Sequence, residues 1–123
     1  MKKNVKKTAK KELTDVYVIS YVDISDYTES VNVGTMMEAH STFRKSYNYL
    51  MRSIEGFAME VISVAKPIVM NEYGTTDPKE VAKKMIVKNN IKPGYGEVVV
   101  KLSHYMGSTH HYAIDRIALK YVK

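Results

Sequence analysis

Residues 15–24 read Asp-Val-Tyr-Val-Ile-Ser-Tyr-Val-Asp-Ile, a run dominated by β-branched and aromatic side chains. This composition is typical of a mostly buried β-strand. The run is followed by the polar residues 25–34, which we interpret as a loop. The sequence therefore predicts one strand over residues 15–24 and an irregular segment after it.

A helix is predicted to follow this loop. Thr35-Met-Met-Glu38 has the form of a capping box, with a threonine at the start and a glutamate three positions later. Large, mostly apolar side chains then recur every three or four positions, which places them on one face of a helix. They are Met36, His40, Phe43, Tyr47, Leu50, Met51 and Ile54. Residues 57–66 keep this phase, although a strand also fits a run of this length. We expect the helix to continue through them and to stop before Pro67.

The C-terminal half predicts a second helix and a hairpin. Asp77-Pro78 supplies an N-cap and a proline at the first helical position, so a helix is expected from there to about Lys88. Residues 89–96 contain several helix and strand breakers and are expected to be a connector. Residues 97–105 alternate as a strand does, residues 106–109 turn the chain, and residues 110–122 form the partner strand.

These elements predict an α+β domain with one or two helices packed on a small, largely antiparallel sheet. The chain has 123 residues, which suits one domain with a real hydrophobic core. We expect a flexible lysine-rich tail over residues 1–13 and the folded domain over residues 14–123.

The chain contains no cysteine, which excludes disulfides, thiolate metal sites and cysteine nucleophiles. No apolar run of signal-peptide type follows the charged N-terminus, and no stretch is long enough to span a membrane. A cytoplasmic protein that does not engage a membrane is the expectation from these features.

The net charge of +6 is concentrated in the tail. Residues 1–11 contain six lysines and no acidic residue, whereas the other 112 residues contain 13 basic and 13 acidic side chains. A short segment this dense in lysine attracts phosphate backbones or acidic protein surfaces. The alternative interpretation is a solvated arm without a partner, or an arm that lies against the chain's own acidic segment at residues 12–38. The tail has no arginine, so nucleic-acid binding by it is expected to be independent of sequence.

Tyrosine and basic residues lie close together in the C-terminal segment, a pattern also found in proteins that stack aromatic rings on bases. Tyrosine is equally a favoured strand residue and an anchor in protein interfaces. The candidate binding residues are Lys2, Lys3, Lys6, Lys7, Lys10, Lys11, Lys83, Lys84, Lys101, Tyr105, Tyr112, Arg116 and Lys120.

The leading hypothesis is a non-enzymatic binding protein whose partner is nucleic acid or an acidic, nucleic-acid-handling protein complex. A small phage or mobile-element inhibitor of a host nuclease or defence system fits this size and composition. No P-loop, dinucleotide fingerprint, Gly-x-Ser-x-Gly elbow or His-Glu-x-x-His motif is present, and no cofactor is expected.

Two alternatives come from other classes. A hairpin turn at residues 107–108 would place His104 opposite His111 and His110 opposite Tyr105, and such a cluster could serve a small metal-dependent nuclease or hydrolase. Surface histidines near a turn are the plainer interpretation. The second alternative is a self-assembling structural protein, a homo-oligomer held by apolar faces.

Overall fold

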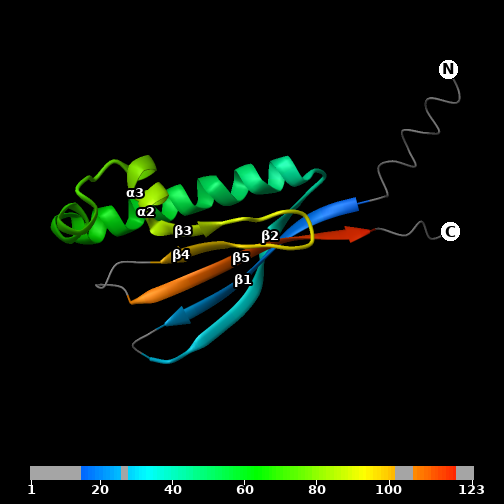
Figure 1. Cartoon of the computed structure of the whole chain (residues 1–123), viewed down its shortest axis with the longest axis horizontal. Helices are drawn as coiled ribbons and strands as arrows, with labels where there is room; N and C mark the ends of the chain where they lie inside the picture. The colour runs from blue at the N-terminus through cyan, green and yellow to red at the C-terminus, as the bar shows by residue number, and fades with distance from the viewer. Residues whose placement is uncertain (1–14, 26–27, 102–106, 119–123) are drawn as a thin grey trace, which may run out of the picture.

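The computed structural model describes residues 15–25, 28–101 and 107–118. The elements of this part of the chain are β1 (Asp15–Ser25), β2 (Val31–His40), α2 (Phe43–Tyr73), α3 (Pro78–Met85), β3 (Ile86–Asn89), β4 (Val98–Lys101) and β5 (Ser108–Ala118). The two helices lie on one side of a single sheet (Figure 1). The predicted α+β class is confirmed.

The five strands are ordered β2-β1-β5-β4-β3, and all neighbours are antiparallel. The first and last strands pair along their whole length, from Asp15 opposite Ala118 to Ser25 opposite Ser108. The described chain therefore begins and ends at the same end of the sheet (Figure 1). We call this the terminal end, and the end at Ser25 and Ser108 the loop end.

Strand β1 confirms the strand predicted over residues 15–24. Its side chains alternate between the two faces of the sheet, as in any strand. Ile19 is fully buried beneath α2, and its pairing partner Ile114 on β5 is 1% exposed. These branched side chains of β1 and β5 thus form the part of the core that the sheet contributes.

Strand β2 corrects two expectations. Residues 31–34 are strand and not loop, and Thr35 does not cap a helix but pairs with Ser20 of β1. The register then shifts, so residues 36–38 form a bulge before Ala39 pairs with Val18. The predicted capping box failed because β1 offers residues 31–35 and 39–40 pairing partners on either side of the bulge, which outweighs a local capping pattern.

Helix α2 starts at Phe43, with Thr42 as its N-cap: the Thr42 hydroxyl accepts from the Lys45 amide at 3.1 Å. It runs through residues 57–66, which confirms helix there. It does not stop before Pro67, because the backbone kinks at Ala65 (φ −137°, ψ 47°) and helical geometry resumes. Proline removes one helical donor and crowds the preceding turn, and the kink relieves that conflict. Gly74 ends the helix with a left-handed φ of 74°.

Helix α3 begins as predicted. The Asp77 carboxylate accepts from the Glu80 amide at 3.1 Å, and Pro78 occupies the first helical position. The helix ends at Met85 and not near Lys88, because Ile86–Asn89 pair with β4 as strand β3. After the connector, Gly96 has a φ of 81°, and a Cβ there would lie 2.2 Å from the Asn90 carbonyl oxygen. This turn into β4 therefore requires glycine.

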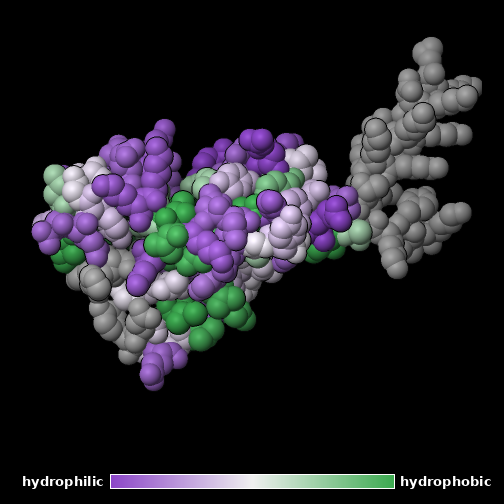
Figure 2. All heavy atoms as spheres, in the orientation of Figure 1, coloured by the Kyte–Doolittle hydropathy of each residue, from purple (hydrophilic) through white to green (hydrophobic). Residues whose placement is uncertain are grey.

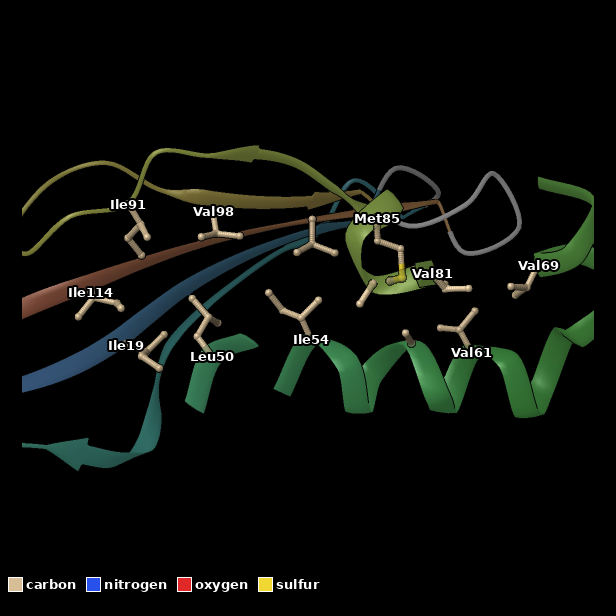
Figure 3. Close-up of a cluster of buried hydrophobic side chains, with 13 residues drawn as sticks. Ile19, Leu50, Ile54, Val61, Val69, Val81, Met85, Ile91, Val98 and Ile114 are labelled. Atoms are coloured by element: carbon tan, nitrogen blue, oxygen red, sulfur yellow. The ribbon is translucent and has the colours of Figure 1, made fainter. Parts of the chain in front are cut away.

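The core lies between the sheet and the two helices (Figure 3). Leu50, Ile54, Ala58, Val61 and Val69 extend from α2 and meet Val81 and Met85 of α3, Ile91 of the connector, and Ile19, Val98, Val100 and Ile114 of the sheet. Nearly all of these side chains are aliphatic, so burial of apolar surface stabilises the contact between the layers. We call this side of the sheet the covered face.

The opposite side of the sheet, the open face, is not packed by either described helix (Figure 1). It displays Val31 and Val33 of β2 at 63% and 67% exposure and Ile117 of β5 at 47%. None of the described helices has the length and apolar character that a membrane crossing needs.

Candidate functional site

The structure locates five of the predicted binding residues. The other eight, namely Lys2, Lys3, Lys6, Lys7, Lys10, Lys11, Tyr105 and Lys120, lie outside the described residues.

The located basic residues do not form one surface. Lys83 and Lys84 are exposed on α3, which packs near the C-terminal half of α2, and Lys101 pairs with Thr109 at the loop end. Arg116 pairs with Tyr17 at the opposite, terminal end. Two of these lysines also have local partners: Lys84 Nζ donates to the Tyr73 carbonyl at 2.8 Å, and Lys83 Nζ is 3.5 Å from Glu80. The terminal end and the loop end are therefore separate candidate surfaces.

Tyr112 lies on the covered face and packs against the core. Its ring stacks on His110, with centroids 6.3 Å apart and planes 10° apart. Burial, with smaller contributions from the charges of Asp23 and Tyr21, raises the pKa of Tyr112 to about 12. The ring is partly buried and packs against other side chains of the domain.

The expected hairpin register is wrong. His111 lies opposite Val99 and His110 opposite Val100, and His104 falls outside the described residues. Because His110 and His111 are consecutive on a strand, they point to opposite faces of the sheet. The predicted histidine cluster is therefore divided, and each of the two histidines has its own carboxylate.

On the covered face, His110 links an acid to a hydroxyl. His110 Nδ1 lies 2.5 Å from Asp23 Oδ1 of β1, and His110 Nε2 lies 3.3 Å from Ser108 Oγ. The edge of the Phe57 ring packs against the imidazole at 5.3 Å between centroids, and the histidine side chain is 13% exposed. The order carboxylate, imidazole, hydroxyl is the arrangement that holds a histidine in one tautomer and aims its second nitrogen at a nucleophile.

On the open face, His111 contacts a different acid. Glu97 accepts from His111 Nδ1 at 3.0 Å through one oxygen, and its other oxygen lies 3.3 Å from Lys88 Nζ. The hydrogen bond with His111, and to a smaller degree Lys88, holds the pKa of Glu97 below its ordinary value despite opposing desolvation. These three side chains border an open hollow of about 350 Å³, which is also lined by Ser20, Val22, Asn90, Gly96 and Ala113.

His40 lies at the end of β2 and not on the first helix. Its Nε2 is 3.0 Å from Glu38, and its ring lies 5.1 Å from that of Tyr49. Among the described residues, no group of three or more histidine, aspartate and glutamate side chains could hold a metal ion. The metal-binding version of the histidine hypothesis thus gains no geometric support from this part of the chain.

Sequence reasoning missed the partners of the histidines. Asp23 is 87 positions from His110 in the sequence, and Ser108 had been assigned to the turn. The strand parity of two adjacent histidines was a usable signal that they face apart. Comparison of the chain with family models, with curated proteins and with solved structures finds no match.

Proposed function

We propose that this protein is a sequence-independent nucleic-acid-binding protein that holds the phosphate backbone at the terminal end of its domain. The observation that carries the proposal is the pairing of Asp15 with Ala118. It brings the attachment point of the six-lysine segment beside the strand that carries Arg116.

The length of the chain limits how far these charges can separate. Lys11 is four residues from Asp15 and so stays within about 14 Å of it, and Lys120 is two residues from Ala118 and stays within about 7 Å. Lys11 and Lys120, the lysines closest to the paired strands in the sequence, are therefore held near the terminal end. Glu12 and Asp15 are nearby acids, but the six lysines outnumber them.

Helix α2 adds to the positive potential of this end. Its N-terminus follows His40, which pairs with Tyr17 near the terminal end. Arg44 and Lys45 are exposed in its first turn, and this turn contains no acidic residue. The amide groups at a helix N-terminus carry partial positive charge. Because no acidic side chain of the first turn neutralises this charge, the helix N-terminus favours binding of a phosphate group.

The test measures affinity for single- and double-stranded nucleic acid over a salt series. Three proteins are compared: the full chain, a variant lacking residues 1–11, and Lys83→Ala/Lys84→Ala as a control that removes two charges outside the terminal end. Each phosphate contact contributes about 0.7 to the slope of log K against log salt for single strands. We expect truncation to reduce the slope by as much as about 4, and the α3 variant to leave it unchanged.

Two outcomes contradict this proposal. Equal losses from truncation and from the α3 variant would move the binding surface away from the terminal end. Absence of binding at low salt would remove nucleic acid as the partner. The remaining hypothesis would then be an acidic protein surface, including the inhibitor role, and capture by the full chain but not by the truncated variant would test it.

The chain of Ser108, His110 and Asp23 favours a hydrolase as the second candidate function. In this role Ser108 Oγ attacks an ester carbonyl while its proton passes to His110 Nε2. The leaving alcohol takes that proton, and water then releases the acyl group with His110 as base. Asp23 holds the imidazole throughout, and the relay requires no metal.

A fluorophosphonate probe, which labels activated serines, tests this candidate. Labelling of the natural chain that is lost in Ser108→Ala and strongly reduced in Asp23→Asn would support it, whereas His111→Gln, on the open face, should label normally. If the natural chain stays unlabelled after prolonged incubation, the relay is structural only.

A further inference from the structure

The two edges of the sheet differ in how they are protected. Edge strand β3 has four residues, a register shift and the charged Lys88, all features that discourage pairing with another chain. Edge strand β2 has ten residues and no lysine, arginine or proline. Its single charged residue is Glu38, and this lies in the bulge.

Among the residues that the structure describes, no strand pairs with the outer side of the regular part of β2, Val31–Thr35. Its inner side pairs with residues 20–24 of β1 without interruption. An edge strand leaves alternate N–H and C=O groups unpaired along its outer side, and these match the groups of another strand. Val31 and Val33 are exposed on the open face, so hydrophobic atoms gather over β2 in the lower part of Figure 2.

Gly34 pairs with Tyr21 of β1, on the covered face of the sheet. The Tyr21 side chain lies over it, so a Cβ at position 34 would be 2.6 Å from the Tyr21 hydroxyl oxygen. The glycine therefore fits a close contact inside the sheet.

We propose that two copies of this chain pair through β2, antiparallel and with a two-fold axis at Val33, to form one continuous ten-stranded sheet. In this register each Val33 faces its own copy, Val31 faces Thr35, and Asn32 faces Gly34. The segment contains no charge, so no like charges meet across the axis. A closed two-fold interface of this kind stops at two copies.

The position of the charge is compatible with a second copy as the occupant. The lysine-rich segments attach at Asp15, seven residues along β1 from the Val22 that pairs with Val33. Antiparallel pairing sends the two attachment points in opposite directions, about 45 Å apart at 3.3 Å per residue. This separation is several times the screening length of about 8 Å at physiological salt. The net charge therefore does not oppose the dimer.

The proposal reaches beyond nucleic-acid binding and does not depend on it. Five paired residues make a small interface, so we expect dissociation in the micromolar range. If the terminal end binds nucleic acid as well, the dimer presents two such ends facing opposite ways.

The absence of cysteine allows a direct test. Val33→Cys introduces a single thiol, which lies on the two-fold axis next to its copy. Antiparallel partners have Cα atoms about 4.5 or 5.5 Å apart, and both values permit a disulfide. At about 50 μM under mild oxidation, we expect most of the Val33→Cys protein to become a covalent dimer. The control is Val87→Cys, at a valine of edge strand β3 whose exposed fraction is 59%. This variant should remain monomeric.

A second measurement guards against random collision of thiols. Light scattering after gel filtration should give a concentration-dependent mass above 14.0 kDa for the natural chain. Val33→Lys, which places two like charges at the axis, should give the single-chain mass, and Val87→Lys should behave as the natural chain does. The proposal would be overturned if the natural chain is monomeric at 200 μM, or if the two cysteine variants cross-link equally.

Discussion

The two faces of the sheet are made from the same strands but have different physical roles. On β5, Ile114 is 1% exposed beneath α2, whereas Ile117, three residues later and on the other face, is 47% exposed. The neighbours His110 and His111 show the same division, since each has a carboxylate partner on its own face. Residue type alone therefore does not decide whether a side chain stabilises the fold or is available to a partner. For these two isoleucines the difference is the face of the sheet on which each lies.

Paired substitutions on β5 test this difference most strongly. Ile114→Ala removes a buried side chain and leaves a cavity, so we expect the free energy of unfolding to fall by about 3 kcal/mol. Ile117→Ala should change it by less than about 0.5 kcal/mol. Urea unfolding followed by circular dichroism measures both. Similar losses at the two positions would mean that the open face is packed in solution.

The covered face should control stability at alkaline pH. The raised pKa of Tyr112 means that the folded state retains the phenol proton that the unfolded chain releases near pH 10. Stability from this group is complete below pH 10 and is lost as pH rises towards 12, by up to about 3 kcal/mol. Tyr112→Phe should flatten this part of the stability curve, whereas Tyr95→Phe, at a residue 65% exposed, should not. Parallel curves for the natural chain and Tyr112→Phe would contradict the expectation.

The open face should contribute a smaller effect at acidic pH. The lowered pKa of Glu97 means that its carboxylate is favoured in the folded state, so its contribution is present above its ordinary value of 4.5 and is lost as pH falls below it. We expect Glu97→Gln to lower stability by less than about 1 kcal/mol at pH 6, since the pair is partly exposed. The difference from the natural chain should shrink by pH 3. Glu60→Gln, exposed on α2, serves as the control in the same urea titration.

Local signals in the sequence predicted the elements that local physics controls. Residues 15–24 are strand because their side chains suit a pleated, buried surface. Asp77 and Pro78 start a helix because the cap and the first turn involve only neighbouring residues. Helix over residues 57–66 was likewise favoured by their phase with the preceding turns.

The elements that failed depend on distant partners. Thr35 had the local environment of a cap, yet the available edge of β1 drew residues 31–40 into the sheet, and the true cap is Thr42. Nothing in the sequence near Met85 indicates that the next residues pair with β4. For the candidate site, the opposite directions of His110 and His111 could have been predicted from strand parity. The partner Asp23 could not, because it is fixed by the β1–β5 register.

The central position of that β1–β5 pair also governs how the protein can fold. The first and last described strands are neighbours in the middle of the sheet, with more than eighty residues between their paired positions. During synthesis, a β1–β2 hairpin and the helices can form early, but the covered face has no complete floor until β5 emerges. Contacts of such long sequence separation slow folding, because the loop they close must be ordered first. A chain that ends before β5 therefore leaves two separate pairs of strands, and the edges of β1 and β4 that β5 joins stay unpaired.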